Sequence, residues 1–86
     1  MQFEGAVVKE QGVTFAIVVV KRHILNSRYA AQQTADAFAV AFPGLPLILM
    51  GQDARGVATY YGRKDIVNFL ARVPVNAIPW QRYTWN

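Results

Sequence analysis

The chain has 86 residues, of which 53% are hydrophobic and 16% are charged, and it has no cysteine. This length suits a single domain over residues 1–86, and the apolar content excludes a disordered chain, which needs low hydrophobicity and high charge. Without cysteine, the sequence excludes disulfides, thiolate metal sites and thiol catalysis. The net charge is +4, so charged partners of this domain are expected to be acidic.

The chain begins with a predicted β-hairpin. Residues 3–9 and 13–21 are rich in β-branched side chains, and the glycine-containing link between them is typical of a hairpin turn. Residues 15–20 are apolar at every position. This run indicates either an inner strand covered on both faces or a strand covered by a partner molecule.

A helix is predicted next, over residues 28–42, where Ala and Gln are frequent. Asn26 and Ser27 are candidate N-caps, because a short polar side chain accepts a hydrogen bond from a free helix N–H. Ile24 continues the apolar face backwards, which leaves open a start before Asn26. Pro43 ends the helix, because proline cannot continue the hydrogen-bond ladder.

The second half of the chain has the same order of elements. Residues 46–50 and 57–61 predict two strands joined by a glycine-containing loop. Residues 63–72 predict an amphipathic helix, with apolar side chains at i, i+3, i+4 and i+7. The aromatic segment 75–86 predicts a short strand or an extended arm, which Pro79 restricts to a sheet edge.

We therefore predict an α+β domain of two ββα units. They form a mainly antiparallel four-stranded sheet with two helices on one face, extended by a C-terminal edge strand. Short matches between 8–14 and 50–58, and between 21–26 and 63–68, suggest an internal repeat. One sheet face is bare in this arrangement, and a second copy of the chain is its simplest cover, so we expect a homodimer.

One segment has a family resemblance. Residues 44–50, followed by a glycine-containing hairpin, Gly62 and an amphipathic helix, resemble the last third of a thioredoxin-type domain. In that family a cis-proline precedes the strand, at the place of Pro46 here. The resemblance implies a truncated thioredoxin-like arrangement as an alternative fold. The family's cysteine pair has no counterpart, so the resemblance implies neither redox activity nor a catalytic residue.

The sequence offers little for catalysis. His23 and Ser27, the single histidine and the single serine, are close enough to meet on a helix. No third group that would orient them is evident, and a capping role for Ser27 is favoured. Acidic residues and histidine lack metal-ligand spacing, and Gly51 and Gly56 lack the Lys and Ser/Thr of a phosphate loop. We expect a non-catalytic protein without metal or cofactor.

Two pairs of basic residues are the candidate binding site for an anion or a nucleic acid. They are Lys21, Arg22, Arg63 and Lys64. Each pair stands at a predicted helix start, where the helix dipole makes a cation unfavourable by about 0.3–1 kcal/mol but where free amides favour anions. The alternative is that these are solvated charges at strand ends that discourage edge pairing.

The aromatic tail supplies candidate interaction residues of the types that are enriched in binding hot spots. They are Trp80, Arg82, Tyr83 and Trp85. Tyr60 and Tyr61 would add stacking surface for single-stranded nucleic acid. The alternative is that these rings cover the domain's own core.

Together these patterns predict a small non-catalytic binding or interaction domain, homodimeric through the sheet or the C-terminal arm. The alternative is a protein that binds nucleic acid or a phosphate-bearing ligand through its basic residues, and an acidic protein would satisfy the same charges. No apolar run approaches the ~20 residues of a membrane span, and no signal-peptide pattern is visible. We therefore expect a cytoplasmic protein without membrane contact.

Overall fold

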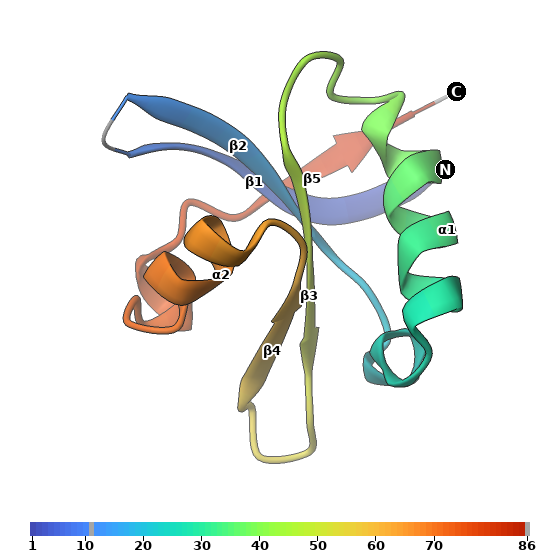
Figure 1. Cartoon of the computed structure of the whole chain (residues 1–86), viewed down its shortest axis with the longest axis vertical. Coiled ribbons are helices and arrows are strands. Elements are labelled where there is room, and N and C mark those ends of the chain that lie inside the picture. The colour runs from blue at the N-terminus through green and yellow to red at the C-terminus, as the bar shows by residue number, and fades with distance from the viewer. Residues whose placement is uncertain (11, 86) are drawn as a thin grey trace.

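A five-stranded sheet between two helices forms the framework of the chain in a computed structural model, which describes residues 1–10 and 12–85 (Figure 1). The strands and the two α-helices follow in the predicted order, and two 3-10 helices that the sequence did not predict lie between them. The elements are β1 (Gln2–Glu10), β2 (Val13–Val19), the 3-10 helix η1 (Arg22–Asn26), α1 (Arg28–Ala39), β3 (Leu47–Gln52), β4 (Ala58–Tyr61), α2 (Lys64–Leu70), the 3-10 helix η2 (Val75–Ala77) and β5 (Gln81–Thr84).

The strands lie in the order β4-β3-β2-β1-β5. Strands β2 and β3 are parallel, and the other neighbouring pairs are antiparallel. The α+β class is confirmed, and the C-terminal segment does supply an edge strand. The predicted four-stranded antiparallel sheet is wrong in detail, because helix α1 returns the chain to the end of the sheet where β2 began. Strand β3 therefore runs in the same direction as β2.

The two helices cover opposite faces of the sheet, which corrects the prediction that both lie on one face (Figure 1). Neighbouring residues of a strand point to opposite sides. Ile17 of β2 lies in one apolar cluster with Leu70 of α2, and Val18 lies in another with Ala31 of α1. The apolar run 15–20 is therefore an inner strand that the chain's own helices cover.

This arrangement removes the reason that was given for a homodimer. The sheet face opposite α1 is covered by α2 and by the segment that follows it, where Ile78 is buried. The described sheet therefore has no bare face for a second copy to cover. The homodimer stays a prediction, but a bare sheet face no longer supports it.

Helix α1 begins where the capping residue predicts. Ser27 is extended, with φ at −120°, and its Oγ accepts a hydrogen bond from the Ala30 N–H at 3.2 Å. Ile24 belongs to the separate 3-10 helix η1, so the alternative of an earlier start for α1 is wrong.

One feature of the thioredoxin resemblance and one of the two proposed repeat matches have no counterpart in the fold. The described residues contain no cis peptide bond, so the bond before Pro46 is trans and this feature of the thioredoxin resemblance is absent. Residues 21–26 form η1, whereas their proposed repeat, 63–68, lies at the start of α2. The repeat stays a prediction that rests on the two hairpins alone.

The C-terminal segment is part of the chain's own core. Strand β5 pairs with β1, and Tyr83 stacks on Phe3 with ring centroids 5.3 Å apart. The Trp80 Nε1–H donates to the Val75 carbonyl at 2.8 Å, and its ring packs on the α2 side. Trp85 packs on the α1 side. The rings therefore contribute to stability within one chain.

Replacing Trp80 by alanine is expected to lower the free energy of unfolding by about 3 kcal/mol, because it removes a half-buried ring together with a hydrogen bond. Urea denaturation measures the loss, and sedimentation of the variant at several concentrations measures its assembly. A stable variant with a reduced molar mass would show instead that Trp80 serves an interface.

Gly62 connects β4 to α2 in a conformation that only glycine adopts easily, with φ at 152°. A Cβ there would lie 2.5 Å from Ile48 Cδ1 and 3.0 Å from the Leu47 carbonyl oxygen. We expect Gly62→Ala to lower the free energy of unfolding by about 3 kcal/mol, from strain and overpacking together.

Gly44 is the matched control for this substitution. Its φ is also positive, at 80°, but nothing lies within 4 Å of an added Cβ. Gly44→Ala is expected to cost only about 1 kcal/mol, for the left-handed backbone alone. Equal losses in the two variants, measured by urea denaturation, would contradict the close packing around Gly62.

Candidate functional site

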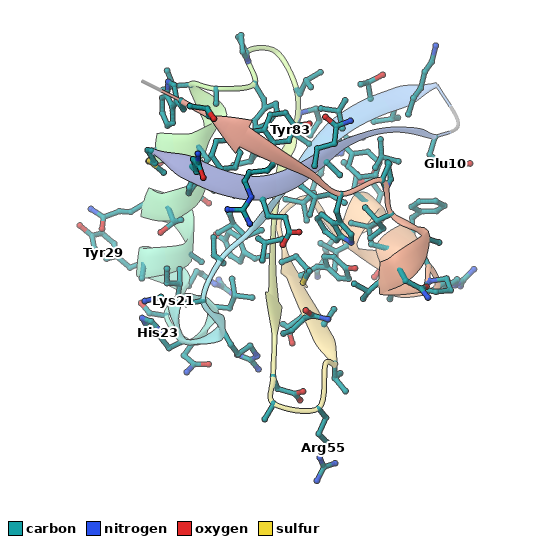
Figure 2. All side chains as sticks on the ribbon, turned by 180° about the vertical axis from the view of Figure 1, so that it is seen from behind. Glu10, Lys21, His23, Tyr29, Arg55 and Tyr83 are labelled. Atoms are coloured by element: carbon teal, nitrogen blue, oxygen red, sulfur yellow. The ribbon has the colours of Figure 1, made fainter. Side chains whose placement is uncertain are left out.

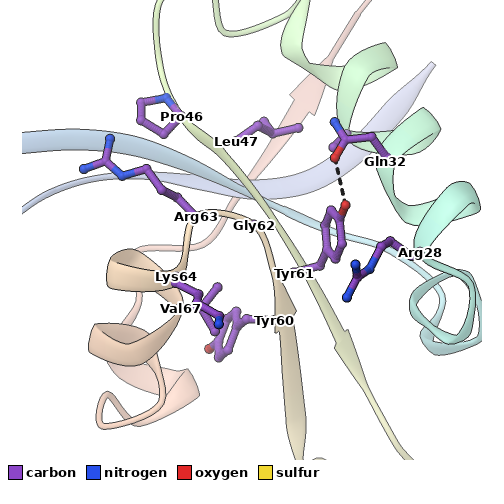
Figure 3. Close-up of a pocket in the computed structure, with 11 residues that line it drawn as sticks. Arg28, Gln32, Pro46, Leu47, Tyr60, Tyr61, Gly62, Arg63, Lys64 and Val67 are labelled. Atoms are coloured by element: carbon purple, nitrogen blue, oxygen red, sulfur yellow. Dashed lines mark hydrogen bonds between the residues drawn. The ribbon is translucent and has the colours of Figure 1, made fainter.

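A groove opens where β4 meets both helices, and we call it the basic groove (Figure 3). Its volume is about 740 Å³. The walls come from α1, the start of β3, the end of β4 and the first turns of α2. The lining residues are Arg28, Gln32, Ala35, Pro46, Leu47, Tyr60, Tyr61, Gly62, Arg63, Lys64 and Val67.

Strand β4 places one tyrosine on each face of the sheet edge. Tyr61 is paired with Leu49 and packs on the α1 side, and Tyr60 is paired with Met50 and packs on the α2 side. Gly62 then turns the chain into α2. The groove therefore wraps around the end of an edge strand, with one helix on either side of it.

The charges of the basic groove are all of one sign. Arg28, Arg63 and Lys64 line it, and no carboxylate does. Arg63 forms an ion pair with Asp65 through two hydrogen bonds of 2.8 Å, from Nε to Oδ1 and from Nη2 to Oδ2. Among the described residues, the side chains of Arg28 and Lys64 have no ion-pair or hydrogen-bond partner. Both are free to bind an anion.

A chain of hydrogen bonds holds the α1 side of the groove in place. The Tyr61 hydroxyl donates to Gln32 Oε1 at 2.7 Å, and Gln32 Nε2 donates to Asp36 Oδ1 at 2.8 Å. This relay fixes the Tyr61 ring against α1 (Figure 3). The ring is half-buried, so it serves as a wall of the groove more than as a free stacking platform.

Tyr60 differs from Tyr61 in its hydroxyl. The Tyr60 oxygen is buried and has no hydrogen-bond partner among the described residues. Burial raises the pKa of Tyr60 above its ordinary value, because the charged form loses its hydration. The hydroxyl therefore stays protonated at neutral pH, and nothing beside it is placed to accept its proton.

The structure brings together half of the predicted basic site. Arg63 and Lys64 line the groove, whereas Lys21 and Arg22 do not. Arg22 lies against Gly51 near the far end of β3, where Arg22 Nη1 donates to Asn26 Oδ1 at 2.8 Å. Arg22 follows β2, which is parallel to β3, so it lies beside the end of β3, whereas Arg63 follows the antiparallel strand β4 and lies beside the start of β3.

Arg28 is the cation that the sequence prediction missed. It is the first residue after the N-cap Ser27, and its side chain reaches the groove from the α1 side. Residues 21–28 hold Lys21, Arg22 and Arg28 and no acidic residue, and this run of like charge was the available signal. Lys21 itself precedes η1 and not α1, so the predicted placement at a helix start holds for the second basic pair only.

The remaining candidates lie outside the groove. Lys21, just before η1, and His23 within it project into solvent (Figure 2). The Ser27 Oγ is occupied as a helix cap, so His23 and Ser27 form no catalytic pair. None of the four predicted tail residues lines the groove. Arg82 is exposed on β5, with Nη1 3.5 Å from Gln2 Oε1.

Among residues 1–10 and 12–85, no group of three or more His, Asp or Glu side chains lies together as a metal site. Within the same residues, no helix has the length and apolar character needed to cross a membrane.

Comparisons of this chain with protein-family models, with curated proteins and with solved structures found no match.

The ion pair between Arg63 and Asp65 can be tested through the pKa of Asp65. Its hydrogen bonds from Arg63 lower the pKa of Asp65 from 3.8 to about 2. Because the pKa of Asp65 is lowered on folding, the ion pair contributes stability that is fully present at pH values above 3.8. This stability is lost as the pH falls through about 2. In Arg63→Gln the pKa of Asp65 is expected to return toward 3.8, as measured by NMR titration of the carboxyl carbon. A value that stays near 2 in the variant would show that Arg63 is not the cause of the lowered pKa.

Proposed function

We propose that this chain is a non-catalytic binding domain that holds an anionic ligand in the basic groove. The observation that carries the proposal is that Arg28 and Lys64, two cations from different helices, lie on either side of the end of β4. Both cations line the groove and neither has a carboxylate partner among the described residues. A cleft lined by charges of one sign concentrates ions of the other sign.

The groups in the groove favour binding over catalysis. Beyond the three cations it presents one amide and two tyrosines, of which Tyr61 is engaged by Gln32 and Tyr60 is protonated. A hydrolytic or transfer reaction needs a nucleophile with a base within hydrogen-bond reach. No such pair lines the groove, whereas guanidinium and ammonium groups suit carboxylates and phosphates.

An acidic segment of a protein fits this groove better than nucleic acid does. Single-stranded nucleic acid binds through successive bases stacked on exposed rings. Here both tyrosines are half-buried, and Tyr61 is tied to α1 by its hydroxyl. A protein ligand needs only carboxylates near Arg28 and Lys64, and it also makes use of the open edge of β4. Nucleic acid is the second candidate, which the three cations and the net charge of +4 favour.

Removing either free cation is expected to weaken anion binding by about threefold to tenfold. The variants are Arg28→Gln and Lys64→Gln, and the measurement is fluorescence anisotropy with labelled polyglutamate and with a labelled single-stranded oligonucleotide. Affinity for both is expected to fall as salt is raised, because ions screen exposed charges.

Lys9→Gln on the β1–β2 hairpin and Arg82→Gln on β5 are matched controls, since each removes the same charge away from the groove. We expect them to bind nearly as wild type. If the controls lose as much affinity as the groove variants, the binding follows net charge and the groove is not the site. If neither ligand binds at low salt, the proposed function is wrong.

A further inference from the structure

Strand β4 leaves its outer edge unpaired in the described chain, because it is the last strand on its side of the sheet. The direction of its backbone groups follows from the register. The Asp53 N–H donates to the Val57 carbonyl at 3.1 Å, and bonded and non-bonded positions alternate along an antiparallel ladder. Thr59 therefore bonds to β3, whereas Ala58 and Tyr60 turn their N–H and C=O groups outward.

This edge lacks the features that usually prevent pairing with another chain, such as charged side chains, proline or a bulge. The four residues of β4 are Ala58, Thr59, Tyr60 and Tyr61, none of them charged. Strand β5, the other edge, has the same length but carries Arg82. Of the two edges, β4 is the better template for an added strand.

An apolar groove of about 540 Å³ runs along β4 on its α2 side. Strand β4 and the preceding residues form one wall, and Val67, Ala71, Val73 and Pro74 contribute to the other. No charged side chain lines it. Val57, at its open end, is 58% exposed.

The apolar groove and the basic groove are continuous, because Tyr60 and Val67 line both. A ligand that lies along β4 therefore meets two kinds of surface in a fixed order. Beside Ala58 it meets apolar side chains, and beyond Tyr61 it meets Arg28 and Lys64.

We propose that β4 accepts an extended segment of another protein as a sixth strand. The segment runs antiparallel to β4, and acidic residues precede alternating apolar and polar residues in it. Main-chain hydrogen bonds to Ala58 and Tyr60 hold it, and every second side chain enters the apolar groove. The N-terminal part of an antiparallel strand lies at the C-terminal end of β4, so its carboxylates reach Arg28 and Lys64. This last feature rests on the proposed function.

A second copy of the chain fits this edge less well. If β4 pairs over its full length with its own copy about a twofold axis, Ala58 of one chain faces Tyr60 of the other. Because the chain turns at residues 54 and 55 and again at Gly62, such a contact is limited to the few residues of β4. The net charge of +4 on each chain opposes the same contact.

The test uses a capped synthetic peptide in which a run of aspartates precedes alternating valine and threonine. Ala58→Pro removes the outward N–H but leaves the ladder with β3 intact, because residue 58 does not donate to β3. This variant is expected to bind the peptide about tenfold more weakly than wild type. Ala58→Val keeps the N–H and is expected to bind as wild type. Circular dichroism is the check that both variants are folded.

A second readout needs no variant. Amide hydrogen exchange of Tyr60 is expected to slow when the peptide is added to wild type, because its outward N–H becomes bonded. A peptide with the reversed order, apolar residues first, is expected to bind more weakly. Equal affinity of the two orders would overturn the antiparallel direction.

The outcomes separate this inference from the proposed function. Equal binding by Ala58→Pro and Ala58→Val, with unprotected Tyr60, would overturn strand addition and leave the anion site standing. Protection of Tyr60 by an uncharged valine–threonine peptide, without any binding of polyglutamate, would support strand addition and overturn the proposed function. Protection that rises with protein concentration alone would assign the edge to a second copy, against the proposal. If no peptide binds or protects, the inference fails.

Discussion

The burial of β2 on both of its faces is the constraint on which the rest of this structure depends. Ile17 and Val18 point to opposite sides of the sheet, and both are fully buried. A strand of this kind needs an apolar layer above and below it. Residues 1–10 and 12–85 hold only two α-helices that could provide these layers, and α1 takes one face while α2 takes the other. The separation of the helices is therefore a consequence of one strand's composition.

The basic groove follows from that separation. Two helices on opposite faces flank the same edge strand, and each presents a cation at its end. Arg28 arrives from the α1 side and Lys64 from the α2 side, and they meet around Tyr61. Gly62 makes this possible, because the chain passes so close to β3 that a side chain would collide with Leu47 and Ile48. Had both helices shared one face, these cations would not lie on either side of one strand end.

Local sequence signals predicted the elements well, because their causes are local. The Ser27 cap marks the start of α1, and apolar spacing marks α2. The placement of the helices was not predictable in this way, since the run 15–20 is equally compatible with cover from the same chain or from a partner. The set of residues that line the basic groove was not predictable from local signals either. Lys21 and Arg63 stand in similar sequence surroundings, but Lys21 follows β2 and Arg63 follows β4, which runs in the opposite direction, so they lie at opposite ends of the sheet.

The aromatic tail accounts for the composition of the surface around β4. Tyr83 and Trp85 pack on the α1 side and Trp80 on the α2 side, so the largest apolar side chains of the tail stabilise the domain itself. A domain this small has few apolar groups to spare for a partner. What its surface retains at β4 is backbone polarity, a narrow apolar groove and unpaired cations. In the binding that we propose, recognition at β4 depends on main-chain geometry and charge, which favour an extended, acidic ligand over a folded apolar one.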